Sequence, residues 1–277
     1  MPAIPDTGDF SRLITALGPW LDQVVVIGGW AHRLYRLDPR AQELNFAPLM
    51  TLDADVAMPA GVRDGTPNIR ELLREHGFEE DFRGDDVPPA THYRLGDGSS
   101  GFYAEFLTLL IGSSSSRSGK RKATQNLAGV NTQQLRYVDL LLRDPWVVRL
   151  PADDFHLPCD TQIQVANPVN YLTQKLLIHA KRDPDSRAKD ILYIHDTLQV
   201  FGARLEDLRE EWDFRTRPQL STKARKTAET APAWLFGTVT DSIRVAATMA
   251  VGRRLAPESV HDACAYGLQQ IMAQKAR

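Results

Sequence analysis

Asp53 and Asp55, two aspartates separated by one residue, are the side chains in this sequence best suited to chemistry. They lie in the stretch TLDADVAM, whose alternation of apolar and polar residues predicts a strand from Thr51 to Met58. Strand side chains repeat with a period of two, so both carboxylates project from the same face. Two like charges at that separation repel unless a cation sits between them, and a divalent metal ion commonly fills that role. The alternative is a polar edge strand with solvated acids, because D-x-D is a short and common pattern.

A pair of glycines upstream adds a second chemical signal. Residues 23–27 predict a short buried strand, which Gly28 and Gly29 end before helical character resumes at Trp30. A glycine turn at a helix N-terminus offers backbone N–H groups and lets phosphates approach closely. Such a turn can also serve only to connect a strand to a helix. Placed before a carboxylate pair of metal-binding type, it indicates metal-assisted handling of a nucleoside triphosphate (NTP).

Glu105 is the candidate for a third acid at such a site. It stands in FYAEFL, a strongly apolar predicted strand in which a charged side chain needs a partner. A structural ion pair with an arginine is the alternative interpretation. Asp97 and Asp139 are weaker candidates, because Asp97 belongs to a glycine-rich turn and Asp139 follows a long polar segment.

The order of these features resembles the nucleotidyltransferase superfamily of the polymerase-β type. The stretches IGGWA at 27–31 and TLDAD at 51–55 are close to its minimal bacterial members. Downstream, YLTQK at 171–175, then KR at 181–182 and KDI at 189–191, look like the helical part of the AbiEii-type toxin nucleotidyltransferases. The resemblance covers roughly residues 20–200. One departure is Gly29, because the second turn residue of the superfamily is often a serine whose hydroxyl could hold a phosphate.

The resemblance implies an enzyme that moves a nucleoside monophosphate from an NTP to an acceptor hydroxyl. Asp53 and Asp55 would hold two Mg²⁺ ions, and Glu105 would share one of them and accept the proton of the attacking hydroxyl. Considered without the resemblance, Lys175 and the charged stretch 182–190 could equally be solvated helix residues. The residues that the resemblance places against the nucleotide are Gly28, Gly29, Thr51, Lys175, Arg182 and Lys189.

The acceptor and the partners are less constrained by the residues. The toxin resemblance and the basic second part of the chain favour RNA, especially a tRNA 3′ end, with a cognate antitoxin as a further partner. One alternative is a transferase that modifies a cationic antibiotic of the aminoglycoside or lincosamide kind, and another is a catalytically idle nucleotide-binding regulator. The basic residues of the polar segment, which could contact RNA or be solvated, are Arg117, Lys120, Arg121 and Lys122. The acids available to a cationic antibiotic are Glu79, Glu80, Asp81, Asp85 and Asp86.

The elements that must position these residues divide the chain in two. Strand and helix signals alternate at first, with a hairpin over 92–111, strands at 138–142, 146–150 and 162–165, and a loop over 112–131. A helix is predicted to start at Thr66-Pro67, and another to be capped by Asp9 or Ser11. After Pro168 the signals are nearly all helical. We therefore expect an α+β fold: a nucleotidyltransferase-type mixed sheet flanked by helices in residues 1–166, followed by a helical bundle in residues 167–277.

Composition excludes several classes of protein. The 277 residues are 43% hydrophobic and 25% charged, which is ordinary for a globular chain and unlike a disordered or fibrous one. No apolar run approaches the roughly 20 residues of a membrane helix, no export signal is visible, and two cysteines fit a reducing compartment. We therefore expect a cytoplasmic protein with no membrane partner. The net charge of −2 argues against nucleic-acid binding by bulk charge, so any RNA contact must be local.

Overall fold

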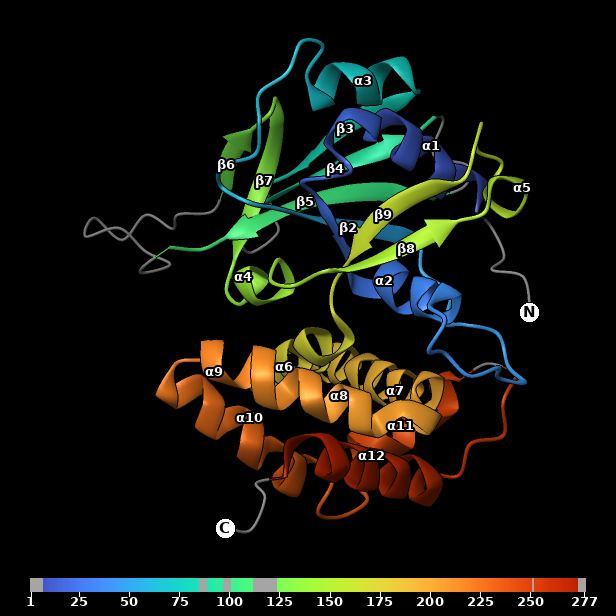
Figure 1. Cartoon of the computed structure of the whole chain (residues 1–277), viewed down its shortest axis with the longest axis vertical. Coiled ribbons are helices and arrows are strands. Elements are labelled where there is room, and N and C mark those ends of the chain that lie inside the picture. Colours follow the sequence, from blue (N-terminus) through green and yellow to red (C-terminus); the bar gives the residue numbers. More distant parts are fainter. Residues whose placement is uncertain (1–6, 85–88, 97–100, 112–123, 251, 274–277) are drawn as a thin grey trace. The chain divides into compact units, whose positions relative to one another are not determined.

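The computed structural model describes residues 7–84, 89–96, 101–111, 124–250 and 252–273. The chain forms two compact units, of which one comprises Ala3–Leu37 with Met50–Asn167 and the other Asp38–Leu49 with Pro168–Arg277. We call the first the sheet unit, because it holds all the described strands, and the second the helical unit (Figure 1). A mixed sheet followed by helices confirms the predicted α+β class.

A nine-stranded mixed sheet forms the centre of the sheet unit. Its strands are β1 (Val25–Ile27), β2 (Asp53–Met58), β3 (Phe78–Arg83), β4 (Ala90–Leu95), β5 (Tyr103–Leu109), β6 (Thr124–Leu127), β7 (Val130–Leu135), β8 (Trp146–Leu150) and β9 (Thr161–Val165). The main path runs in the order β3, β4, β5, β2, β1, β9, β8, and β7 pairs with β5 and β6 beside it. Strands β2 and β5 are parallel neighbours, whereas β1 and β4 run antiparallel to β2 and β5 respectively. The two strands that carry the predicted acids are therefore adjacent, and each is flanked within the sheet by another strand on its other side.

Aromatic packing anchors the helix that follows the glycine pair. The helices of the sheet unit are α1 (Gly8–Ala16), α2 (Gly28–Leu34), α3 (Ile69–Glu75), α4 (Val138–Leu141) and α5 (Ala152–Phe155). Trp30 of α2 stacks on Phe10 of α1, with ring centroids 3.9 Å apart, and meets Phe102 edge-on at 6.4 Å. All three rings are buried. Since stacked and edge-on aromatic pairs add to the stability that burial provides, they hold α2 and its first turn in a fixed place.

The helical unit contains α6 (Pro168–Ile178), α7 (Pro184–Val200), α8 (Leu205–Glu211), α9 (Arg217–Gln219), α10 (Thr222–Leu235), α11 (Asp241–Met249) and α12 (Pro257–Met272). Helix α7 begins at Pro184, because the Asp183 side chain accepts a hydrogen bond from the Ser186 N–H and Pro184 occupies the first turn. Across the described ranges of the chain, every helix is too short or too polar to cross a membrane.

Residues 38–49 belong to the helical unit although they precede it by more than a hundred positions. The Gln42 N–H donates to the Val200 carbonyl at 2.8 Å, and Arg253 donates to the Ala47 carbonyl at 3.1 Å. The same guanidinium lies 3.9 Å from the centre of the Phe46 ring and forms an ion pair with buried Asp196 at 2.7 Å. These contacts fasten the segment, which we call the strap, to the helices.

Several local predictions are wrong. The predicted loop over 112–131 contains β6 and the first two residues of β7, which pair as a hairpin, while 112–123 lie outside the described residues. Residues 138–141 form α4 and not a strand, because a short apolar run has no periodicity that separates the two. Strand β3 was not predicted: its sequence FEEDFR is acidic, and it forms because it pairs with β4 along its whole length.

The start of α3 also differs from the prediction. Its N-cap is Asn68, whose side chain accepts from the Glu71 N–H at 3.0 Å while the Glu71 carboxylate accepts from the Asn68 N–H at 2.8 Å. This is a capping box, and Thr66 takes no part in it. Helix α1 is preceded by Thr7, with no side-chain cap, in place of the predicted Asp9 or Ser11.

We expect Asn68→Ala to lower the free energy of unfolding by about 1 kcal/mol, because both hydrogen bonds of the capping box depend on this residue. Thr66→Ala is the matched control, since Thr66 is exposed and should leave stability within about 0.5 kcal/mol of the wild type. Urea unfolding followed by circular dichroism measures both. Equal losses in the two variants would contradict the assignment of the cap.

Candidate active site

Strands β2 and β5 place the three predicted acids on one face of the sheet. In their parallel pairing, Asp55 lies opposite Glu105 and Asp53 lies opposite Tyr103. Paired residues of neighbouring strands project to the same face, as do alternate residues of one strand. The side chains of these four residues therefore share a face. The intervening residues Ala54, Val56, Ala104 and Phe106 are buried and face the opposite way.

Tyr103 is sensitive to the charge on this face. Its pKa is raised well above the usual value of a phenol, first by burial and then by the negative charges of Asp53, Glu105 and Asp55. The nearby guanidinium of Arg94 acts in the opposite direction. Because all three carboxylates act on a single phenol, they form one region of negative potential, and such a region attracts a cation.

Neighbouring polar side chains hold two of the acids. The Thr51 hydroxyl donates a short hydrogen bond to Asp53. On the other side, Nε2 of His92 lies 2.6 Å from a carboxylate oxygen of Glu105, and the His92 ring stacks on Tyr103 with centroids 4.3 Å apart. The partner of Glu105 is therefore a histidine, where an arginine was the expected structural alternative. His92 was not predicted as a site residue. The predicted hairpin could have identified it, because a hairpin that pairs Leu95 with Phe102 across the turn places residue 92 opposite residue 105.

The glycine pair packs directly against the acids. Gly28 has a φ of +62°, and a Cβ there would lie 1.9 Å from a carboxylate oxygen of Asp55. A Cβ at Gly29 would lie 2.8 Å from three side-chain atoms of Thr51. Both separations are shorter than real Cβ contacts, so both positions require glycine. Thr51 thus fills the space next to the second turn residue, which explains why a glycine stands where the resembled superfamily often has a serine.

Two of the predicted phosphate-binding cations meet at a buried aspartate of the helical unit. Lys175 Nζ lies 2.6 Å from one carboxylate oxygen of Asp190, and Arg182 Nε lies 3.2 Å from the other. The side chains of Lys175 and Asp190 are only 7% and 2% exposed, whereas that of Arg182 is 41% exposed. The ammonium of Lys189 lies 5.7 Å from the Tyr193 ring, which the Lys175 ammonium also approaches, at 5.2 Å. Lys175 is therefore not a solvated helix lysine, and Asp190, absent from the predicted site, is what orients it.

The predicted site residues belong to different units. Gly28, Gly29, Thr51 and the three acids lie in the sheet unit, whereas Lys175, Arg182 and Lys189 lie in the helical unit. In the helical unit, Lys175 and Arg182 share Asp190, whereas Lys189 is related to Lys175 through the Tyr193 ring that both approach.

The donor chemistry of the acids fits Mg²⁺, which prefers hard carboxylate oxygens. Asp53, Asp55 and Glu105 supply such oxygens from adjacent positions on one face. In the described part of the chain, no group of three or more His, Cys, Asp or Glu residues is arranged to hold a metal ion. One oxygen of Asp53 accepts a hydrogen bond from Thr51, and one oxygen of Glu105 contacts His92. In this structure these oxygens are therefore bonded to protein groups.

Three of the other predicted acids are engaged in ion pairs, and a fourth, Glu79 of β3, is exposed. Asp139 in α4 pairs with Arg143 at 2.7 Å, and in β3 Glu80 pairs with Arg70 at 2.6 Å and Asp81 with Arg94 at 2.7 Å. These pairs leave less negative charge for a cationic antibiotic than the sequence indicated. The predicted residues that lie outside the described part of the chain are Asp85, Asp86, Asp97, Arg117, Lys120, Arg121 and Lys122.

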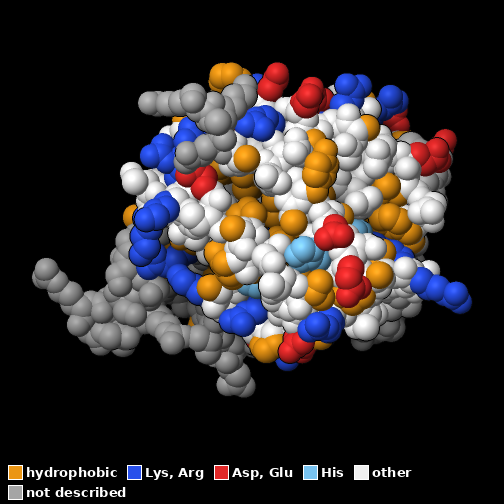
Figure 2. All heavy atoms as spheres, turned by 90° about the horizontal axis from the view of Figure 1, so that it is seen from below, with side chains coloured by type: hydrophobic (Ala, Val, Ile, Leu, Met, Phe, Trp, Pro, Cys, Tyr) orange, Lys and Arg blue, Asp and Glu red, His pale blue; other side chains and the backbone are white. Residues whose placement is uncertain are grey.

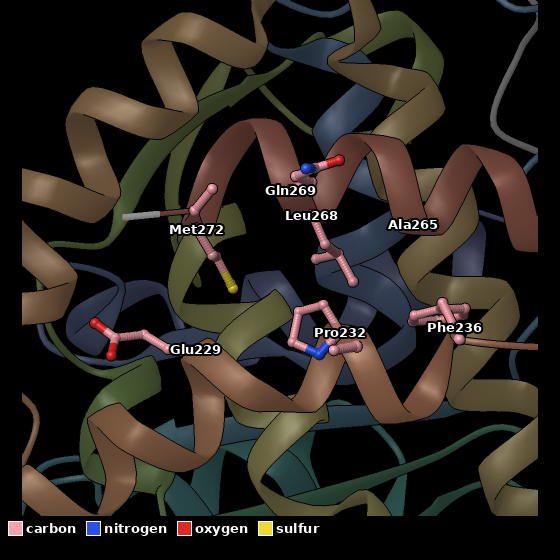
Figure 3. Close-up of a pocket in the computed structure, with 10 residues that line it drawn as sticks. Glu229, Pro232, Phe236, Ala265, Leu268, Gln269 and Met272 are labelled. Atoms are coloured by element: carbon pink, nitrogen blue, oxygen red, sulfur yellow. The ribbon is translucent and has the colours of Figure 1, made fainter. Parts of the chain in front are cut away.

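Part of the protein surface is apolar. Figure 2 shows one face of the molecule, where hydrophobic side chains lie exposed between charged ones. Figure 3 shows a pocket of about 290 Å³ between α10 and α12, with Pro232, Leu268 and Met272 pointing toward it and Glu229 at its edge. None of the predicted site residues lines this pocket.

Comparison with known proteins places the chain in a class and then in a family. An α+β chain whose sheet presents acids beside a glycine turn is of the nucleotidyl-transferring kind that the sequence indicated. Residues 5–215 match a nucleotidyltransferase family. The match spans most of the chain, so the chain belongs to this family and is a nucleotidyltransferase, as predicted.

Among solved structures, the chain is similar to MenT4, a nucleotidyltransferase toxin from Mycobacterium tuberculosis H37Rv. The two share 14% sequence identity with a TM-score of 0.41, over 97% of this chain and 83% of the other. No curated protein matches the sequence.

We expect Gly29→Ser to lower the free energy of unfolding by about 1–3 kcal/mol, because the new side chain would overlap Thr51. The overlap disappears in Gly29→Ser/Thr51→Gly, so the double variant should be more stable than the sum of the single losses by at least about 1 kcal/mol. Gly8→Ser is the control, since nothing lies within 4 Å of its Cβ position. Additive losses in the double variant, measured by denaturant unfolding, would refute this packing.

Proposed function

We propose that this nucleotidyltransferase transfers a nucleoside monophosphate from an NTP to a hydroxyl of RNA, with tRNA as the preferred acceptor, and that Asp53, Asp55 and Glu105 form its catalytic centre. The observation that carries the proposal is the shared face of these acids beside a turn that tolerates no side chain. Residues 1–166 would carry the chemistry and residues 167–277 would bind phosphates. Mg²⁺ bound to the three carboxylates would supply charge neutralisation at the α-phosphorus and on the leaving group.

In the proposed reaction, the acceptor oxygen attacks the α-phosphorus of the NTP and forms a new P–O bond. The bond between the α-phosphorus and the bridging oxygen to the β-phosphate breaks, and pyrophosphate leaves with that electron pair. Glu105 accepts the proton of the acceptor hydroxyl. His92 positions the Glu105 carboxylate through the 2.6 Å contact, and Thr51 orients Asp53. The backbone N–H groups of Gly28 and Gly29 would bind phosphate oxygens, which can come close because neither residue has a Cβ.

The cations of the helical unit would bind the triphosphate. Lys175 is fixed by Asp190 and by two tyrosine rings, each 5.2 Å from its ammonium group. Arg182 shares the same aspartate yet remains partly exposed, so its remaining N–H groups can reach a phosphate oxygen. Lys189 would contribute through its charge alone. A positive group held in advance loses little conformational freedom when the anion binds.

The toxin role rests on the AbiEii-like stretches at 171–175 and 181–191, and we extend the proposal to a growth-inhibiting enzyme that a cognate antitoxin neutralises. RNA is favoured over a cationic antibiotic because two acids of β3, Glu80 and Asp81, are already paired with arginines. A cytoplasmic location would follow from an RNA acceptor.

The test is to incubate the purified protein with Mg²⁺, each of the four α-labelled NTPs in turn, and total tRNA. We expect label in the RNA with at least one NTP, and we expect EDTA to abolish it. Parallel reactions replace tRNA with an aminoglycoside or a lincosamide. Label in the drug and none in RNA would refute the proposed acceptor, and no transfer to any acceptor would refute the proposed activity.

Asp53→Asn should reduce transfer at least about 100-fold, because it removes a metal-binding charge while keeping the side chain's shape. Asp22→Asn is the matched control: Asp22 is an exposed aspartate of the same unit, paired with Arg63, and its loss should change the rate less than about twofold. Initial rates of label incorporation measure both variants, with circular dichroism to verify folding. Retention of wild-type activity in Asp53→Asn would exclude this residue from catalysis.

Lys175 offers a way to separate binding from folding. Lys175→Met should destabilise the protein by about 3 kcal/mol, because it removes one of the cations that face the buried Asp190. In Lys175→Met/Asp190→Asn the buried charge is gone, so most of the stability should return while KM for the NTP stays raised about tenfold or more. If wild-type KM returned together with stability, Lys175 would have only a structural role.

A further inference from the structure

Trp234, in the last turn of α10, presents a large aromatic surface to solvent. Trp234 is 50% exposed, although an indole is usually buried in a stable helical bundle. One neighbour of the ring is the imidazole of His179, whose centroid is 5.9 Å away with the two planes at 62°. This edge-on contact holds the indole at a defined place in the helical unit and leaves part of its surface accessible.

His179 is buried and carries a hydrogen-bonding atom that the described protein does not use. The residue is 5% exposed, and its Nδ1 has no hydrogen-bond partner among the described residues. Burial and the charge of Arg187 lower the pKa of the imidazole, while Asp190 acts against them, so the ring is neutral at neutral pH. A buried polar atom with no partner is costly, and a ligand that supplies one recovers that cost.

These two rings lie next to the cations that would bind phosphate. Lys175 and His179 are four residues apart where α6 continues into a short 3₁₀ turn, so their side chains lie on one side, about one helical turn apart. Asp190, which binds Lys175 and Arg182, is close enough to His179 to act on it electrostatically. Cationic donors and an exposed aromatic ring thus stand side by side within the helical unit.

We propose that Trp234 and His179 bind the nucleobase of a nucleotide whose phosphate is held by Lys175 and Arg182. The base stacks on the exposed indole, and Nδ1 of His179 forms a hydrogen bond with the base edge. Cations for the backbone and an aromatic ring for the base are the two components of sequence-tolerant nucleotide binding, because every base has a π face. The inference rests on the proposed function, since the phosphate-binding role of the cations comes from there. The base can belong to the NTP or to the end of the RNA acceptor.

The experiment measures Trp234→Ala and Trp234→Phe in steady-state transfer, with KM determined separately for the NTP and for tRNA. We expect Trp234→Ala to raise one of the two KM values about tenfold with kcat changed less than twofold, and Trp234→Phe to restore most of the affinity. A raised KM for the NTP assigns the base to the donor, and a raised KM for tRNA assigns it to the acceptor. Tyr266→Ala is the matched control, because Tyr266 is an aromatic residue of the same unit that is 60% exposed, and both of its KM values should stay unchanged.

Direct binding keeps this inference separable from the proposed reaction. Titration calorimetry measures the affinity of each variant for each of the four NTPs and for a single-stranded oligoribonucleotide. If the wild type transfers nothing, the proposed function fails, while a tenfold weaker binding of either ligand by Trp234→Ala still supports the nucleobase site. Unchanged binding and unchanged KM values in Trp234→Ala, with the variant folded, would overturn it.

Discussion

Repulsion between like charges on adjacent strands is the constraint that the sheet unit must satisfy. Neighbouring strands lie about 5 Å apart, and two unit charges at that distance repel by about 3 kcal/mol at an effective dielectric constant of 20. That is a large part of the 5–15 kcal/mol by which a typical domain is stable. The hydroxyl of Thr51 and the ring of His92 offset the repulsion by engaging Asp53 and Glu105. The buried opposite face of β2 and β5 prevents the acids from turning away from one another.

In the helical unit, the group that needs compensation is the single buried carboxylate of Asp190. A buried carboxylate is costly without a partner, and here two cations from different turns of the chain share it. The arrangement fixes Lys175 in the interior while Arg182 stays accessible, so one aspartate positions two groups of different exposure. A single carboxylate of α7 thereby links to Lys175 of α6 and to Arg182, and fixes where both positive charges lie.

The sequence predicted what depends on local pattern. The period of two placed Asp53 and Asp55 on one face, and the apolar surroundings of Glu105 marked it as needing a partner. The identity of that partner, His92, depends on the register between strands, and the role of Asp190 depends on how two helices pack. Neither is a local property. The polar strands β3, β6 and β7 were missed for the same reason, because pairing with a neighbour, and not hydrophobic alternation, makes them strands.

The strap has a consequence for how this architecture can be inherited. Since residues 38–49 belong to the helical unit, the described part of the polypeptide passes from one unit to the other three times, after residues 37, 49 and 167. Neither unit is encoded by one continuous stretch. A recombination event that replaced everything after residue 167 would supply helices that had never been selected to receive Gln42, Phe46 and Ala47. Exchange of the helical part between relatives therefore requires two coordinated replacements, which ties the evolution of the acidic sheet face to that of the basic helices.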